Sequence, residues 1–474
     1  MGEEIRNSRF TRTDFVEFEQ RLRAETQLMR ELLESGGFSE RRNVAGIELE
    51  AWLVDEHARP LPINEAFLAR IDNPMVVPEL SAFNVELNVE PQVLTGRAIS
   101  LLRDELTTTW RTCRDTAREL GADMVAIGIL PTVHDGDLTL AHMSDTERYR
   151  ALNEQILAAR GGEPLVLNIV GRQHIDAVHD HVMLEAAATS LQLHLQVSPG
   201  EAVAVYNAAL IASAAVVAVS ANSPYAFEHD LWDESRIPLF EQSIGADAGG
   251  GGRVTFGDRF ESGSLYSCFE ANVARFPVLL PSTRDEPPGR LSHLRLHNGT
   301  IWRWNRPLVG FDDDGTPHLR IEHRVIPAGP TIADAFANAA FFYGLVRALA
   351  DSGQTAAPSM AFEQARWNFY EAARYGLHCS NRWLDGPLRA MRDIVIEDCL
   401  PLARDGLRQL DIDPHEIDYF LGIIGARTAS DQNGANWQRR WVARHGFDVR
   451  ALTENYMRRQ ATGQPVHEWD MQAA

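Results

Sequence analysis

The sequence predicts a mixed fold in two parts, with helices and strands over residues 1–330 and a mainly helical region over residues 331–474. Two observations predict this division. Several short runs before residue 330 alternate apolar and polar residues, which is typical of half-buried strands. After Pro330 the apolar residues recur at helical spacing, and few strand patterns remain. We therefore expect an α+β domain with a helical C-terminal region packed on it.

The predicted elements follow from this periodicity and from the Gly and Pro residues that end each run. Before residue 330 we expect helices over residues 13–35, 98–120 and 200–221, and strands over 44–54, 83–90, 124–130, 191–197, 299–305 and 319–325. After it we expect helices over 331–351, 360–376, 385–410 and 445–460. The run Gly249–Gly252 is predicted to be a mobile surface loop, because no Gly-Lys-Ser/Thr follows it.

The composition is that of an ordinary globular protein, with 45% hydrophobic and 23% charged residues in a chain of 474. Its 45 Lys and Arg residues against 66 Asp and Glu residues give a formal net charge of −21. This charge disfavours non-specific binding to nucleic acid or to anionic membranes, because phosphates would be repelled. It does not exclude ATP, because bound cations can reverse the local field.

Several features indicate a cytoplasmic protein. The four cysteines lie far apart, and none forms a Cys-x-x-Cys pair. This pattern suits a reducing compartment and gives no zinc framework. The first residues lack the apolar run of a signal peptide. The most apolar stretch, residues 208–221, is about 14 residues long, which is too short to span a bilayer.

The most informative feature is the set of polar residues on the predicted strands. Side chains two residues apart on a strand point to the same face. Each of four strands therefore carries polar side chains on one face and apolar side chains on the other. The polar sets are Glu48 and Glu50; Glu86, Asn88 and Glu90; Gln192, His194 and Gln196; and Arg320, Glu322 and Arg324.

Two interpretations of these polar faces compete. The simpler one is a two-sided sheet with one face in solvent. A solvated face usually mixes Lys, Thr, Ser and Glu, whereas these sets contain no Lys and repeat Glu, Gln, His and Arg. Five carboxylates on one face would repel each other unless cations lay among them. Carboxylate oxygens are the ligands that Mg²⁺ prefers, and Mg²⁺ joins such ligands to phosphates. A metal-lined catalytic sheet is the favoured interpretation.

Three arginines extend this interpretation. Arg236 follows the segment Trp-Asp-Glu-Ser, Arg306 lies at the end of the aromatic segment Thr300–Pro307, and Arg324 follows Ile-Glu-His. Arginine binds carboxylates and phosphates through paired hydrogen bonds. Each of these arginines alone would be an ordinary surface ion pair, but beside a carboxylate-rich metal site they indicate anionic substrates.

These residues carry a family resemblance. The segments Gly46–Glu50, Glu86–Glu90, Gln192–His194, Ser220–Pro224 and Ile321–Arg324 follow one another in order, with Asn433–Gln438 and Pro465–Trp469 in the helical tail. Together they resemble the glutamate–cysteine ligase family, in the bacterial carboxylate–amine ligase branch related to the plant-type enzymes. The resemblance covers roughly residues 15–470. It implies a glutamine synthetase-like fold, in which a curved, mainly antiparallel sheet forms a funnel-shaped active site with helices outside.

The resemblance also implies a reaction and roles for single residues. The reaction is ATP-dependent joining of the γ-carboxyl group of glutamate to the amino group of cysteine, through an acyl phosphate, in glutathione biosynthesis. Arg324 and Arg306 match catalytic positions at the transferred phosphate, and Arg236 and Asn88 match substrate-binding positions. Two or three Mg²⁺ ions would be held by Glu48, Glu50, Glu86, Glu90, Gln192, His194 and Glu322.

Several alternatives stay open at this point. The segment 293–307 is longer and more aromatic than the corresponding stretch of plant-type enzymes, so another amine or acid could be the substrate. A metal-dependent phosphohydrolase would use the same carboxylates to activate water. A non-catalytic nucleotide-binding protein could keep the fold, although it would be free to lose the carboxylates. The helical tail could close the funnel, bind a partner or support a homodimer.

Overall fold

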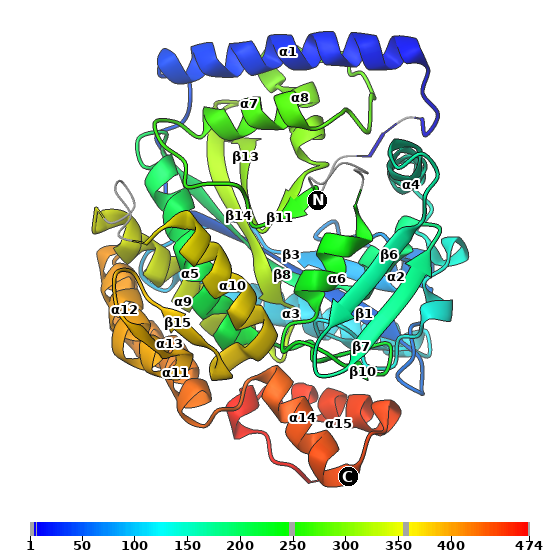
Figure 1. The fold of residues 1–474 in the computed structure, drawn as a ribbon, viewed down its shortest axis with the longest axis vertical. Helices are drawn as coiled ribbons and strands as arrows, with labels where there is room; N and C mark the ends of the chain where they lie inside the picture. Colours follow the sequence, from blue (N-terminus) through cyan, green and yellow to red (C-terminus); the bar gives the residue numbers. More distant parts are fainter. Residues whose placement is uncertain (1–3, 6, 246–251, 354–359, 473–474) are drawn as a thin grey trace.

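The computed structural model describes residues 4–5, 7–245, 252–353 and 360–472, so the predicted loop Gly249–Gly252 lies outside the described residues except for its last glycine. The long helix α1 (Arg12–Glu34) lies across one end of the molecule above α7 (Tyr266–Arg275) and α8 (Ser292–Asn298), as Figure 1 shows. The C-terminal helices α14 (Gly434–His445) and α15 (Val449–Ala461) lie at the opposite end.

The centre of the fold is an eight-stranded sheet in which every strand pair is antiparallel. Its main path runs in the order β13-β14-β8-β1-β3-β2, and two further strands pair with β1. These strands are β1 (Val44–Val54), β2 (Val76–Pro78), β3 (Asn84–Asn88), β4 (Gln92–Val93), β5 (Asp123–Val125), β8 (Ser190–Val197), β13 (Asn305–Phe311) and β14 (Pro317–Pro327). This sheet and the mainly helical C-terminal region confirm the predicted fold class.

The register of the sheet places the predicted polar residues side by side. Glu50 pairs with Glu86 across β1 and β3, and Glu48 pairs with Gln192 across β1 and β8. Glu322 pairs with His194 across β14 and β8. Because cross-strand partners point to the same face, the polar sets of separate strands form one continuous polar face. A bulge between His323 and Ile326 then shifts the register of β14 just where Arg324 lies.

The opposite side of the fold is built on two apolar helices. Helix α5 (Ala202–Ser220) contacts β14, and helix α9 (Ile332–Asp351) packs against α5. Both helices are long and apolar enough to cross a membrane, but 89% of each apolar window is buried inside the fold. They therefore serve here as core helices. Helix α5 confirms the helix predicted over 200–221 to within two residues at either end, and Ala202, Val205 and Tyr206 near its start are buried as well.

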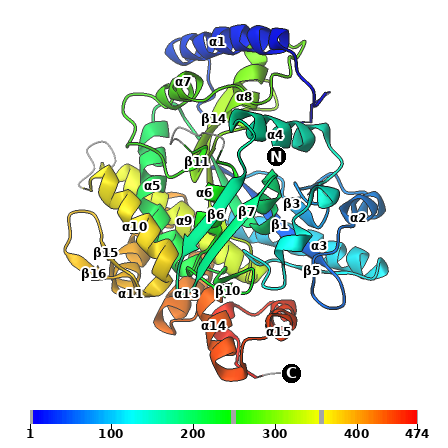
Figure 2. The same ribbon diagram turned by 45° about the vertical axis from the view of Figure 1, so that its right-hand side comes forward.

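The remaining elements surround these two layers, and Figure 2 shows the hairpin of β6 and β7 at the front of the molecule. The helices are α2 (Asn64–Ile71), α3 (Ala98–Glu119), α4 (Glu147–Ala159), α6 (Arg236–Ser243), α10 (Phe362–Tyr375), α11 (Met391–Ile394), α12 (Leu400–Gln409) and α13 (Pro414–Ala429). The short strands are β6 (Leu165–Val170), β7 (His174–His179), β9 (Tyr225–Ala226), β10 (His229–Asp230), β11 (Val254–Thr255), β12 (Trp302–Arg303), β15 (Ser380–Arg382) and β16 (Leu388–Ala390).

Several predicted elements differ from the structure, and three of these differences have a clear local cause. The strand predicted over 124–130 ends at Val125. The chain then runs so close to Ser223 and Pro327 that a Cβ atom at Gly128 would collide with their side chains. The strand predicted over 299–305 is divided, because residue 299 caps α8 and the strand pairing begins at Trp302. The helix predicted over 385–410 begins at Met391, after a hairpin whose turn contains Gly386 and Pro387, two residues that disfavour helix.

The C-terminal helices are joined to the rest of the fold through Asn222. Its side chain donates to the Ala328 carbonyl and to the Tyr456 hydroxyl, each at 2.8 Å, and accepts from Gln438 Nε2 at 3.1 Å. Gly434 begins α14 directly against this side chain, where a Cβ atom would collide with it. The contact therefore fixes α14 and α15 to the chain segment that precedes α6.

A buried ion pair strengthens the same junction. Arg439 on α14 binds Asp233, and its Nε donates to Asp230 at 2.8 Å. Its other nitrogen donates to the carbonyls of Leu231 and Trp232. Asp233 is only 1% exposed, so its charge depends on this partner. The arginine thus holds the segment that leads into α6.

We expect Arg439→Ala to lower the free energy of unfolding by about 3–5 kcal/mol, because it leaves the buried Asp233 without its partner. Urea unfolding at neutral pH measures this change. Arg450→Ala is the matched control, because Arg450 lies on α15 in an exposed pair with Glu454 and should leave the unfolding midpoint unchanged. Equal urea midpoints for Arg439→Ala and Arg450→Ala would show that the Arg439–Asp233 ion pair does not stabilise the fold.

Candidate active site

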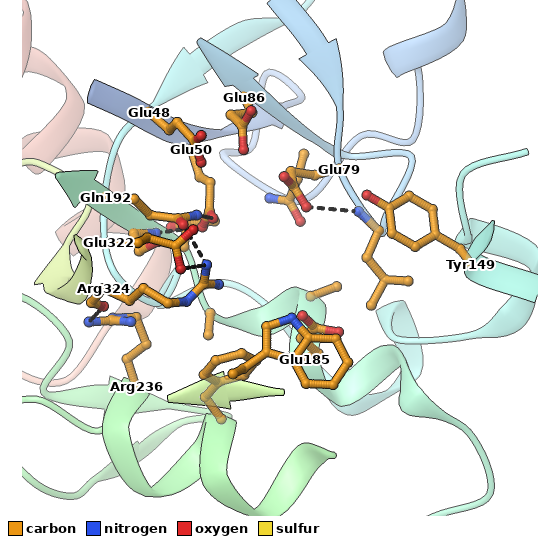
Figure 3. Close-up of a pocket in the computed structure, with 18 of the residues that line it drawn as sticks. Glu48, Glu50, Glu79, Glu86, Tyr149, Glu185, Gln192, Arg236, Glu322 and Arg324 are labelled. Carbon is orange, nitrogen blue, oxygen red and sulfur yellow. Dashed lines mark hydrogen bonds and ion pairs between the residues drawn. The ribbon is translucent and has the colours of Figure 1, made fainter. Parts of the chain in front are cut away.

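The polar face of the sheet lines two adjoining cavities of about 110 Å³ each. Both cavities are bordered by Glu48, Arg148, Gly299, Arg306 and Glu322. Figure 3 shows the first of them, with side chains from several strands pointing inward. Among the described residues, six carboxylates line this first cavity, namely Glu48, Glu50, Glu79, Glu86, Glu185 and Glu322.

The first compact group in the cavity consists of Glu50, Glu79 and Glu86, whose carboxylate oxygens lie within 4.8 Å of one another. Glu50 accepts from the Ser190 backbone N–H at 2.6 Å and from Gln192 Nε2 at 2.8 Å. Glu79 follows the end of β2 and was not predicted. Three carboxylates this close repel one another unless protons or cations lie among them.

The second compact group consists of Glu48, His194 and Glu322, again with ligand atoms within 4.8 Å of one another. His194 Nε2 lies 3.0 Å from Glu48 Oε1, yet neither ring nitrogen makes an aligned hydrogen bond to a described residue. Two carboxylates and an imidazole nitrogen that has no aligned hydrogen-bond partner form a set of ligand atoms that suits a divalent cation. Both groups therefore fit the Mg²⁺ ions that the sequence predicts.

Three arginines border the carboxylates. Arg306 binds Glu322 through two hydrogen bonds of 2.8 and 2.9 Å, and Arg324 Nη1 donates to Glu322 at 3.1 Å and to Gln192. Arg236 donates to Glu234 and to the backbone carbonyls of residues 324 and 325. Nη1 of Arg236 and Nη2 of Arg324 make no hydrogen bond to the described residues, so these two nitrogens can meet an anionic substrate.

Arg236 is positioned by the chain that precedes it. Glu234 accepts from Arg236 Nε at 3.2 Å with one oxygen and from the Asn222 backbone N–H at 2.9 Å with the other. The Arg236 guanidinium also lies 5.3 Å from the ring centre of Trp304. The C-terminal helices, which hold Asn222, therefore support a residue of the cavity from outside it.

The two compact groups differ in their charge balance. Burial alone would raise the pKa of Glu322, but Arg306 and Arg324 outweigh it and hold this pKa below its usual range. Burial and the neighbouring Glu48 instead raise the pKa of Glu86 to about 7. Burial, with Glu86 beside it, raises the pKa of Glu79 well above its ordinary value. Among the described residues, no arginine binds directly to the first group, and Arg324 and Arg236 act on Glu50 only from further away.

The structure brings together most of the predicted site residues. Glu48, Glu50, Glu86, Gln192, Arg236, Arg306, Glu322 and Arg324 line the first cavity, and His194 lines the second. It does not bring Glu90 there, because β3 ends at Asn88 and Glu90 is exposed. Asn88 does not line either cavity and donates to Glu86 at 3.0 Å, so it supports a carboxylate and does not face a substrate.

Four ionisable residues of the first cavity were missed by the sequence analysis: Glu79, Arg148, Tyr149 and Glu185. Glu79 lies in the turn after a three-residue strand, and Glu185 lies in the short 3-10 segment Val182–Ala187. Arg148 and Tyr149 begin α4, a helix that was not predicted. None of these positions belongs to an alternating run, so periodicity gave no signal for them.

Comparison with protein families gives one match, to a model described as glutamate–cysteine ligase family 2, over residues 44–465. This range contains every predicted site residue and both parts of the fold. Comparison with curated protein sequences gave no match.

Solved structures share the fold at low sequence identity. Glutamate–cysteine ligase from Francisella tularensis, solved in complex with AMP, superposes with a TM-score of 0.56 at 12% identity, covering 92% of this chain and 91% of that one. A bifunctional glutathione synthetase from Pasteurella multocida gives a TM-score of 0.53 at 12% identity, covering 95% of this chain and 55% of that one. At such identity these likenesses bear on the fold alone.

The charge imbalance of the first group predicts a pH-dependent effect of Glu86→Gln. The pKa of this carboxyl is raised from 4.5 to about 7, so the folded state favours its protonated form and loses stability as pH rises through 7. The variant should therefore unfold at a higher temperature than the wild type at pH 8 without Mg²⁺, and this gain should vanish below about pH 4.5.

The same measurement tests the cation. Mg²⁺ at pH 8 should raise the unfolding temperature of the wild type clearly and that of Glu86→Gln much less, because one charged ligand is gone. An equal Mg²⁺ effect on both proteins would argue against a cation at this group.

Proposed function

The chain belongs to glutamate–cysteine ligase family 2, and we propose that it is an ATP- and Mg²⁺-dependent ligase that forms a γ-glutamyl amide from glutamate and cysteine. The observation that carries the proposal is the polar cavity, in which two groups of potential metal ligands lie beside arginines with free nitrogens. The membership confirms the predicted family and the enzyme class of glutamate–cysteine ligases. The individual acid, amine and intermediate are proposals.

The chemistry follows from the need to activate a carboxylate. An amine cannot displace oxide from a carboxylate at neutral pH, because the leaving group is too poor. Transfer of the γ-phosphoryl group of ATP to the acid gives an acyl phosphate with a good leaving group. Two or three Mg²⁺ ions would neutralise the phosphate charges when bound. The residues that would hold them are Glu50, Glu79 and Glu86 in one group and Glu48, His194 and Glu322 in the other.

The arginines have separate proposed roles. Arg324 and Arg306 surround Glu322, the ligand of the last strand, and would stabilise the charge that develops on the transferred phosphoryl group. Arg236 has a free nitrogen at the cavity and would bind a carboxylate of the acid substrate. Attack of the amine on the acyl carbon then forms the amide bond and releases phosphate with the bonding electrons.

A metal-dependent phosphohydrolase remains the alternative from another class, because the same carboxylates could activate water. It would not require an acid substrate for ADP release.

We also propose that the enzyme is cytoplasmic. Cys113, Cys268, Cys379 and Cys399 are all free and buried, which supports this location. We also propose that the enzyme forms a homodimer, which the molar mass of the protein in solution would test.

ADP release tests the proposed reaction directly. Purified protein with ATP and Mg²⁺ should release ADP only when glutamate and an amine are both present, and mass spectrometry should detect a γ-glutamyl product with cysteine. Release with glutamate and another amine only would keep the mechanism and change the amine. Release without glutamate would favour the phosphohydrolase, and no release with any acid would contradict both enzymes.

Arg324→Lys tests the phosphoryl role, because lysine keeps the charge and loses the fixed fork of donors. We expect kcat to fall by at least about tenfold, equivalent to about 1.4 kcal/mol of transition-state stabilisation. Arg450→Lys, on the exposed surface of α15, is the control and should keep full activity. A smaller loss for Arg324→Lys than this would remove the arginine from the transfer step.

A further inference from the structure

One carboxylate of the cavity belongs to neither group of potential metal ligands. Five of the six cavity glutamates fall into the two compact groups, and Glu185 is the remaining one. Figure 3 places Glu185 across the cavity from Glu48 and Glu86, with Arg324 and Arg236 on one side and Tyr149 on the other. The proposed metal and phosphate chemistry gives this residue no role.

The backbone around Glu185 is fixed by packing. The neighbouring side chains Val182, Met183 and Leu184 are all fully buried. The Val182 N–H donates to Asn153 Oδ1 at 3.0 Å, which ties the segment to α4. The Glu185 carbonyl accepts from the Ala188 N–H at 2.9 Å, closing the short helical turn. The carboxylate is therefore held at the cavity wall by a rigid support, as a site residue requires.

The carboxylate itself lacks a partner. Among the described residues, no side chain or N–H donates a hydrogen bond to it, and no cation lies within salt-bridge distance. Its charge interacts from further away with Arg324, Glu50 and Arg148. Apolar and aromatic residues, among them Leu152, Phe240 and Trp302, line the same cavity. A half-buried carboxylate in such surroundings is costly unless a ligand supplies the missing cation.

The proposed reaction has one ammonium group that must react. Glutamate, ATP and the acyl phosphate carry a net negative charge and react at carboxylate or phosphate groups, whereas the amino group of the acceptor reaches the enzyme as an ammonium ion. This ion must lose a proton before its nitrogen can attack. A suitable base lies near the reacting centre and has a pKa near the working pH. Burial raises the pKa of the Glu185 carboxyl to about 7, which agrees with this requirement.

We propose that Glu185 is the catalytic residue that binds the ammonium group of the acceptor amine and accepts its proton. The proposal rests on the proposed ligase function. The ammonium ion gives one proton to the carboxylate of Glu185, and the lone pair that remains on nitrogen forms the bond to the acyl carbon. The bond from carbon to the phosphoryl oxygen breaks, and phosphate leaves with the electron pair. The leaving phosphate takes up the second proton that the nitrogen must lose to become a neutral amide. No oxidant or further reactant is needed.

The test compares two acceptors in Glu185→Gln. Hydroxylamine is largely unprotonated at neutral pH, so it needs no base, whereas cysteine or another amino acid does. With the amino acid, kcat/KM for the amine should fall by about 100-fold. With hydroxylamine, formation of the γ-glutamyl hydroxamate should stay within about threefold of the wild type, because acyl phosphate formation is intact. Glu185→Asp, which keeps the charge, should recover part of the amino acid reaction.

The control and the contrary outcomes separate this proposal from the proposed function. Glu154→Gln, at an exposed position of α4, should behave as the wild type with both acceptors. Equal losses with both acceptors in Glu185→Gln would place the residue in acid activation or in folding and overturn the proposal, and so would full activity with both. A wild type that is inert with glutamate and either acceptor would overturn the ligase function itself.

Discussion

The structure depends on the burial of many like charges on one face of a single sheet. Six carboxylates share a small cavity, and two arginines bind directly to one of them, Glu322. Desolvation and mutual repulsion make such an arrangement unfavourable in the free protein. The apolar helices α5 and α9, on the other side of the fold, supply the burial that offsets this cost. Such a cavity is suited to bind cations and the ammonium group of a reactant.

This constraint explains the position of the arginines. Arg306 and Arg324 both converge on Glu322, so the second group carries almost no excess negative charge. The first group, with Glu50, Glu79 and Glu86, keeps its excess. The cavity therefore has one side suited to a bound cation alone and another suited to phosphate between cation and guanidinium groups. The two groups share strand β1, and their outer members, Glu86 on β3 and Glu322 on β14, lie three strands apart in the sheet.

Periodicity predicted the face of the sheet but not its borders. Alternation correctly placed Glu48 with Glu50, and Gln192 with His194, on one face of their strands, because a strand repeats every two residues regardless of its partner. It did not predict the register, which places Glu50 opposite Glu86 and Glu322 opposite His194. It also placed Glu90 on that face, which failed because the strand ends two residues earlier. Glu79 and Glu185 lie in a turn and a short 3-10 segment, where no repeat exists and only tertiary packing fixes the direction of a side chain. The family resemblance supplied the curved sheet, which periodicity alone did not.

Cavity-facing and core-facing positions alternate along each strand, so mutations in the gene fall into two separate kinds. A mutation at an even position of β1, such as 48 or 50, alters the chemistry of the cavity, whereas one at the intervening Leu49 alters contacts with the core. The two sets of positions can thus diverge independently over evolutionary time. Such independence is compatible with a common architecture at 12% identity to the Francisella tularensis enzyme. It also means that new acceptor amines could be selected in this scaffold without rebuilding its interior.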